Sequence, residues 1–155
     1  MRLIRFAGAA LVAALVVATG TAAGAGSAKK FTCTIQLHDV AAPGASGEEF
    51  GTVGCAGVGK GVEHDPVVTV TPTSETTGTA TGPFKQFFDT GTMHGTFTLT
   101  YTVTPPMSVA YSGTARISGG TGAYKHVRGT AKVVCASADG GTHTNCTEKA
   151  TLTHR

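Results

Sequence analysis

Hydrophobic and polar residues alternate along most of the chain from residue 31 onward. The alternation is most regular from His94 to Thr104, where Phe, Leu, Tyr and Val take one face and Thr takes the other. It recurs from Phe31 to His38. A period of two residues is typical of a β-strand with one buried face, and no long stretch has apolar residues at helical spacing. The sequence therefore predicts an all-β domain.

Turn-forming residues divide this pattern into roughly eight predicted strands. The clear strands are residues 31–38, 50–56, 67–71, 94–104, 108–118, 129–136 and 142–153. Residues 83–91 form a further strand or a packed loop, and residues 41–49 and 73–82 are predicted loops. About eight strands suit a small antiparallel up-and-down β-barrel, and a β-sandwich is the alternative. A barrel of this size has an interior just large enough for packed side chains or one small ligand.

The first 28 residues look like a secretory signal peptide. Arg2 and Arg5 precede an apolar segment, residues 6–18, that is too short for a comfortable membrane span. Small residues follow it, and we expect cleavage after one of three of them: Ala23, Ala25 or Ala28. This leaves residues 29–155 as a single secreted domain that is not attached to a membrane.

Removal of that leader lowers the formal net charge from +3 to +1, because Arg2 and Arg5 leave with it. The rest of the chain has no run of basic residues and few aromatic residues. Nucleic-acid binding therefore has no support in the sequence. The Gly-rich stretch at residues 119–122 lacks the Gly-Lys-Ser/Thr ending of a phosphate-binding loop, and we predict neither a cofactor nor a metal.

Four cysteines in a secreted chain predict two disulfides, and we favour Cys33–Cys55 and Cys135–Cys146. A two-residue turn at residues 140–141 would place Cys135 directly opposite Cys146, within the distance that a disulfide spans. Cys33 and Cys55 lie on the apolar faces of consecutive predicted strands. The Cys-x-x-Cys spacing of many zinc sites is missing, which favours disulfides over a metal.

The acidic residues give no paired site. Glu63, His64 and Asp65 are adjacent, and a carboxylate beside a histidine can orient a general base. However, neighbours on a strand point to opposite faces, and Asp-Pro is typical of a turn, so we predict a solvated loop at residues 63–66. The acidic residues in or beside clear strands are Asp39, Asp89 and Glu148, and no strand-borne acidic pair stands out.

One stretch, residues 119–129 (GGTGAYKHVRG), connects two predicted strands. We expect Tyr124 and Val127, its large apolar residues, to plug one end of the core. The stretch resembles the GGTG-x-aromatic-x-x-small-Arg-Gly signature of dirigent proteins and is similar to the related turn of allene oxide cyclase-like barrels. The resemblance implies an antiparallel barrel, a trimer, and barrel residues that hold an oxygenated aromatic substrate. It assigns the signature arginine to Arg128, whose ordinary role would be to pair with a carboxylate or cap carbonyls at the turn.

The sequence thus favours a secreted, disulfide-stabilised barrel that binds a small apolar or aromatic ligand or has a non-catalytic extracellular role. One alternative is a dirigent-like or cyclase-like enzyme that steers ring closure or coupling of a reactive intermediate. Another is a sandwich-type apoprotein that binds a chromophore. No catalytic residue is assigned. The candidate ligand-binding residues are Phe97, Leu99, Tyr101, Tyr111, Tyr124 and Arg128, of which the apolar ones would equally fill an ordinary core.

Overall fold

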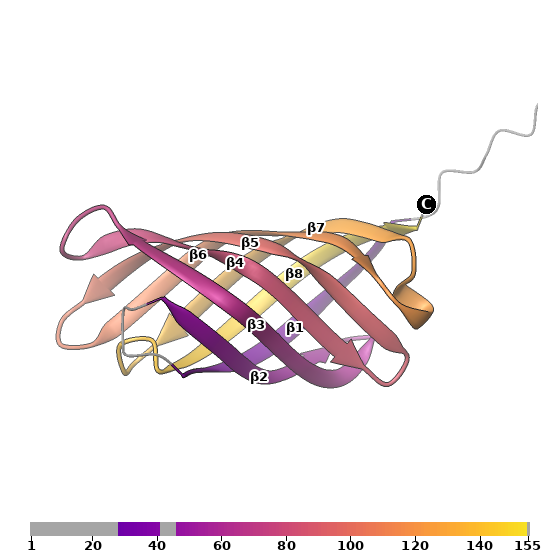
Figure 1. Cartoon of the computed structure of the whole chain (residues 1–155), viewed down its shortest axis with the longest axis horizontal. Helices are drawn as coiled ribbons and strands as arrows, with labels where there is room; N and C mark the ends of the chain where they lie inside the picture. Colours follow the sequence, from indigo (N-terminus) through magenta and orange to yellow (C-terminus); the bar gives the residue numbers. More distant parts are fainter. Residues whose placement is uncertain (1–27, 41–45, 155) are drawn as a thin grey trace, which may run out of the picture.

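The chain forms a closed antiparallel β-barrel of eight strands, shown from the side in Figure 1. The computed structural model describes residues 28–40 and 46–154, so the predicted signal peptide lies outside the described residues apart from its last residue. The strands are β1 (Lys29–Asp39), β2 (Gly47–Cys55), β3 (Gly59–Pro72), β4 (Thr77–Phe88), β5 (Gly91–Thr104), β6 (Ser108–Gly120), β7 (Val127–Ser137) and β8 (His143–His154). Within these ranges, no helix is both long enough and apolar enough for a membrane crossing.

Each strand pairs with its neighbours in sequence, and β8 pairs with β1 to close the ring. This confirms the predicted up-and-down barrel and excludes the sandwich. The alternation of the sequence becomes an alternation of burial. Along β1, Phe31, Cys33, Ile35 and Leu37 are buried inside the barrel, while the residues between them are exposed. A period-two pattern on a closed sheet thus sends every second side chain into one common interior.

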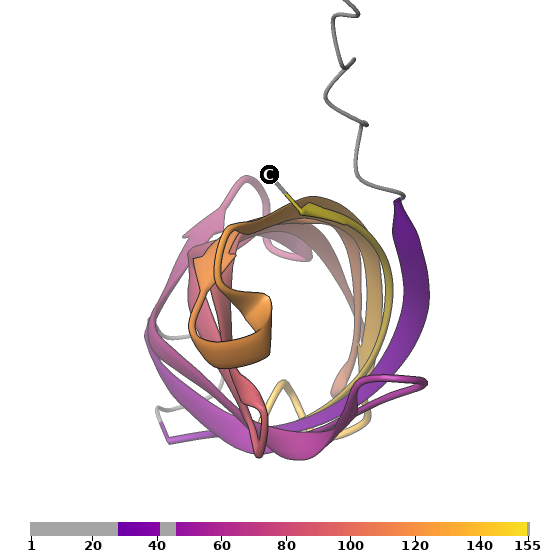
Figure 2. The same cartoon turned by 90° about the vertical axis from the view of Figure 1, so that its right-hand side faces the viewer.

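The two ends of the barrel differ. One end, which we call the η1 end, carries the 3-10 helix η1 (Gly122–Tyr124), and its turn folds over part of the opening in Figure 2. The Tyr124 ring lies 5.7 Å from that of Phe88, between ring centroids, and its hydroxyl forms a hydrogen bond with Thr90. Val127 is fully buried. The predicted plug by Tyr124 and Val127 is therefore confirmed. The opposite end, called the far end, carries the β3–β4, β5–β6 and β7–β8 connections.

The structure corrects three predicted loops. Residues 63–66 belong to the continuous strand β3, and residues 77–82 belong to β4. Of the loop predicted at residues 41–49, residues 47–49 belong to β2, and residues 41–45 lie outside the described residues. In β3 the register towards β4 shifts between His64 and Thr69, which is a β-bulge. Pro66, which has no N–H to donate, lies in this bulge, so the Asp-Pro pair marks an irregularity within a strand and not a turn.

Both predicted disulfides are present. Cys33 and Cys55 are register partners that join β1 to β2, and Cys135 and Cys146 are register partners that join β7 to β8. All four cysteines are buried inside the barrel. The β7–β8 pairing is the one that a turn centred on residues 140–141 predicts.

We expect each disulfide to stabilise the barrel, because it restricts the unfolded chain over sequence separations of 22 and 11 residues. Replacing either pair by serine should lower the free energy of unfolding by about 3 kcal/mol. Urea unfolding followed by circular dichroism measures this, with Thr147→Ser, an exposed substitution beside Cys146, as the control. An unchanged unfolding midpoint in both double variants would contradict the prediction.

Candidate functional site

Three acidic side chains are buried inside the barrel. Glu63 and Asp65 of β3 and Glu148 of β8 are 6%, 2% and 4% exposed. Glu63 and Asp65 are two residues apart on one strand, so both point inward. His64 lies between them and points outward, where its Nε2 is 2.6 Å from Glu48 Oε1. The prediction of a solvated loop without an acidic pair is therefore wrong for this segment.

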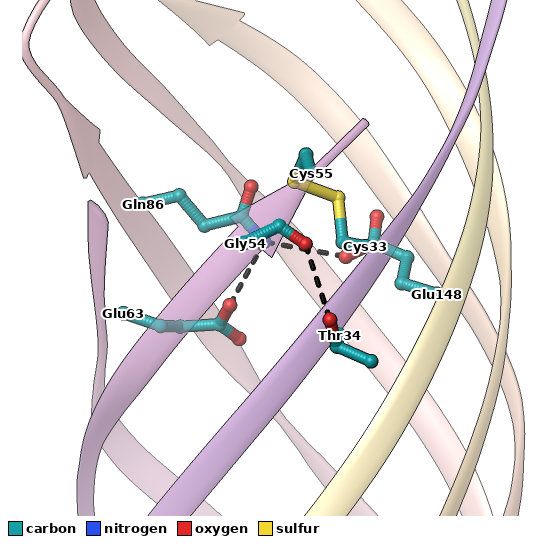
Figure 3. The surroundings of a disulfide bond; sticks show 7 residues. All are labelled: Cys33, Thr34, Gly54, Cys55, Glu63, Gln86 and Glu148. Atoms are coloured by element: carbon teal, nitrogen blue, oxygen red, sulfur yellow. Dashed lines mark hydrogen bonds between the residues drawn. A yellow bond between two sulfur atoms is a disulfide. The ribbon is translucent and has the colours of Figure 1, made fainter. Parts of the chain in front are cut away.

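Gln86 of β4 connects two of these carboxyl groups across the interior. Its amide nitrogen donates to Glu63 Oε2 at 2.8 Å and to Glu148 Oε2 at 3.2 Å, as Figure 3 shows. A side-chain amide has two N–H donors, so this geometry uses both. Gln86 is 2% exposed, and it links the carboxyl group of the neighbouring strand β3 to that of β8, which lies across the barrel from β4.

Asp65 has no such support. Its Oδ1 atom is buried and accepts no hydrogen bond from the described residues. An unpaired buried polar atom costs about 1–3 kcal/mol, so native structures rarely keep one without a reason. This oxygen also belongs to a residue that lines the interior cavity. It is therefore the strongest single sign of a functional site in the barrel.

Two further carboxyl groups extend the acidic cluster towards the far end. Asp39 of β1 is the register partner of Glu49 of β2, and Glu49 is the register partner of Asp65. Burial and the nearby charge of Asp39 raise the pKa of Glu49 to about 7. Burial raises the pKa of Tyr111 on β6 to about 12, and the nearby charges of Glu49 and Asp39 add to this effect. Carboxyl groups of β1, β2, β3 and β8 thus form one group, which we call the interior acids: Asp39, Glu49, Glu63, Asp65 and Glu148.

Cationic side chains are kept outside. Across residues 28–40 and 46–154, every Lys and Arg is exposed. Without a buried cation, burial raises the pKa of Glu63 and Asp65 well above their ordinary values, and neighbouring carboxylates add to the effect. Burial also raises the pKa of Glu148, although the hydrogen bond from Gln86 opposes this. We therefore expect part of the interior acids to be protonated near neutral pH.

A cavity of about 50 Å³ lies beside these groups. Its walls include the carboxyl groups of Glu49, Glu63, Asp65 and Glu148, and most of the remaining lining is apolar. This volume holds a few water molecules or a small chemical group. It is well below the roughly 300–1,000 Å³ of pockets that enclose drug-sized ligands. A larger ligand could place only its head here.

The structure brings together part of the predicted ligand-binding set. Phe97, Leu99 and Tyr111 line the cavity. Tyr101 is the register partner of Tyr111, with ring centroids 6.1 Å apart. Tyr124 lies at the η1 end, away from the cavity, and Arg128 is exposed.

Sequence reasoning missed Glu49, Glu63, Asp65 and Gln86. The available signal was the two-residue spacing of Glu63 and Asp65, which puts both on one face of any strand. The bulge at Pro66 concealed that strand. Gln86 stands at an inward position between Phe84 and Phe88, and the same alternation would have placed it inside.

In the part of the chain that the structure describes, no three His, Cys, Asp or Glu side chains are arranged to hold a metal ion. The carboxyl oxygens in the cavity lining suit hydrogen-bond donors and positive charge on a ligand, and a carboxyl group that keeps its proton can donate it.

The interior acids give an expected pH dependence of stability. The pKa values of Glu49, Glu63, Asp65 and Glu148 are raised in the folded state, so between the ordinary values, 4.5 for Glu and 3.8 for Asp, and the raised values the folded chain binds more protons than the unfolded chain. Their effect on stability is most favourable below pH 4.5 and is lost as the pH rises through neutrality. We expect the free energy of unfolding to fall by a few kcal/mol, roughly 2–4, between pH 5 and pH 9.

Urea unfolding at both pH values measures this fall. The variant Asp65→Asn should show a smaller fall, whereas the exposed control Asp89→Asn should behave as the wild type. Equal falls in Asp65→Asn and the wild type would show that the buried carboxyl groups do not titrate as expected.

Comparisons with models of known protein families, with curated proteins and with solved structures give no match to this chain. The likeness of residues 119–129 to dirigent and cyclase-like barrels therefore stays a prediction, and the function must be inferred from the site itself.

Proposed function

We propose that this protein is a secreted binding protein that takes a small, largely apolar ligand into the barrel through the far end. The observation that carries the proposal is the mixed lining of the cavity, in which apolar side chains surround the unpaired, buried Oδ1 of Asp65. Binding sites for small molecules commonly combine an apolar wall with a few polar groups that fix orientation.

The route of entry follows from the two ends. At the η1 end, Phe88, Met93, Tyr124 and Val127 belong to the core or pack against it. Towards the far end, Tyr101 and Tyr111 are only partly buried, as are Asp39 and Glu49. A ligand entering there meets aromatic rings and carboxyl groups first. Past these residues, the cavity has room for only a small group of the ligand.

Secretion is part of the proposal and rests on the predicted leader. The two disulfides support it, because disulfides form and persist mainly in oxidising compartments outside the cytosol.

A second candidate function is favoured by the buried carboxyl groups. A carboxyl group that keeps its proton near neutral pH can protonate a reactive intermediate held beside it. Glu63 and Asp65 therefore make an enzyme that steers ring closure or coupling a reasonable alternative. Turnover distinguishes the two functions, since a binding protein releases its ligand unchanged.

Methyl NMR tests the proposed binding. Benzyl alcohol and 1-butanol, titrated separately, should shift the methyl signals of Ile35, Leu37, Val68 and Leu99, which line the cavity. The methyl signals of the packed η1 half should stay in place and serve as an internal control: Val53, Ile117, Val127 and Leu152.

A matched pair of variants sharpens this test. Ala80→Leu adds volume to the cavity wall and should abolish the shifts, whereas Ala136→Leu adds the same volume on the exposed side of β7 and should leave them. The η1-half signals report whether each variant is folded. Shifts that are equal in both halves, or a complete lack of shifts with both probes, would refute binding in the cavity.

A further inference from the structure

We propose that the ligand is a small amine, whose ammonium group lies among the interior acids and whose apolar part lies against Phe97, Leu99 and the two tyrosines. This inference rests on the proposed ligand-binding function and names the chemical class of the ligand. Four features of the barrel lead to it: its hydrogen-bonding balance, its charge, its size and its apolar wall.

The buried side chains offer more acceptors than donors. Among the residues that the structure describes, the buried polar ones are Glu63, Asp65, Gln86, Ser137, Thr144 and Glu148. Each of the three uncharged ones already donates elsewhere. Gln86 donates to Glu63 and Glu148, the Ser137 hydroxyl to Asp139 Oδ1 at 2.8 Å, and the Thr144 hydroxyl to the Gly141 carbonyl at 3.3 Å.

None of these donors reaches Asp65, which is 2% exposed and whose Oδ1 is unpaired. A ligand that brings its own hydrogen-bond donors would satisfy this oxygen. An ammonium group has three of them and no acceptor, which suits a site rich in carboxyl oxygens.

The charges point to the same group. Five carboxyl groups face the interior or its far end, and every Lys and Arg of the described segments lies on the outside. A buried carboxylate is stabilised by an opposite charge within a few ångströms, and no Lys or Arg of the described residues lies inside to supply one. A cationic ligand would be attracted to this interior, whereas an anionic ligand of the same shape would be repelled.

The cavity volume selects among cations. A volume of about 50 Å³ favours a compact ammonium group over the larger, planar guanidinium. The described residues do not assemble the three or more ligating side chains expected of a metal site. The aromatic wall also suits an amine, because Tyr101 and Tyr111 can contact both an ammonium group and the carbon chain attached to it.

Binding should be linked to proton release. The titratable groups that face the ammonium group are Asp39 on β1, Glu49 on β2, Glu63 and Asp65 on β3, Tyr101 on β5, Tyr111 on β6 and Glu148 on β8. Strand β4 contributes the neutral Gln86, and the inward cysteine of β7 is held in a disulfide. A cation favours the ionised carboxylate, so an amine should expel protons from this group. Its affinity should fall in acid, where the carboxyl groups are protonated, and again where the amine itself loses its charge.

Isothermal titration calorimetry at pH 7.5 tests the inference with two probe families: butylamine, 1-butanol and butyrate, and benzylamine, benzyl alcohol and benzoate. The amine of at least one family should bind ten or more times more tightly than its alcohol, and the carboxylate should not bind. In buffers of different ionisation enthalpy, the observed heat should reveal protons released by the amine and none released by the alcohol.

Variants identify the partner of the ammonium group. Asp65→Asn should weaken amine binding by ten times or more and alcohol binding by much less, because only the amine loses a charge partner, whereas Asp89→Asn, an exposed substitution with the same change of charge, should change neither. Urea unfolding confirms that both variants are folded. Glu63→Gln, which keeps the shape of a second interior acid, should reduce the number of protons released.

The outcomes separate this inference from the proposed function. If the alcohols bind as tightly as the amines, the barrel binds ligands but the inference is wrong. If no probe binds, both are wrong. If calcium ions displace the amines at equal concentration, or shift the cavity methyl signals when the amines do not, the interior acids form a metal site and the inference is overturned.

Discussion

Closure of the sheet is the constraint on which the rest of this structure depends. Once β8 pairs with β1, no strand has a free edge, and every inward position of eight strands shares one narrow space. Inward side chains from different strands therefore lie close to one another. The disulfides lie inside the barrel because their cysteines occupy inward positions. The interior acids lie close together for the same reason, although they come from β1, β2, β3 and β8.

The bulge in β3 adjusts this arrangement. Up to Asp65 the inward residues of β3 are odd-numbered, and from Val68 onward they are even-numbered. Because of this change, Asp65 and Val68, which are three positions apart, both line the cavity. It also leaves Asp65 opposite Glu49, which is itself opposite Asp39. Three carboxyl groups thus meet in one row across neighbouring strands, where like charges destabilise one another unless protons or a cation intervene.

Much of the fold could be predicted from the sequence because alternation and closure have a direct signal. The strand at residues 94–104 and the Cys135–Cys146 register follow from a period of two and a turn at residues 140–141. The first half of β4 could not be predicted, because its inward residues are small. Gly78 and Gly82 leave room for the rings of Tyr101 and Phe97, so the large hydrophobic residues of this region lie on the partner strand β5.

The candidate site could be predicted only in part. Phe97, Leu99 and Tyr111 were found through their apolar pattern, whereas Glu63, Asp65 and Gln86 appear as surface residues until closure places them inside.

The unpaired oxygen of Asp65 also has a consequence for the history of the protein. A buried acid is a costly choice for folding, and an apolar residue of similar volume at such a position often leaves a fold as stable or more so. Selection for a durable barrel alone would tend to remove the interior acids, one substitution at a time. Their joint presence in a chain of this length indicates that selection has favoured something other than durability.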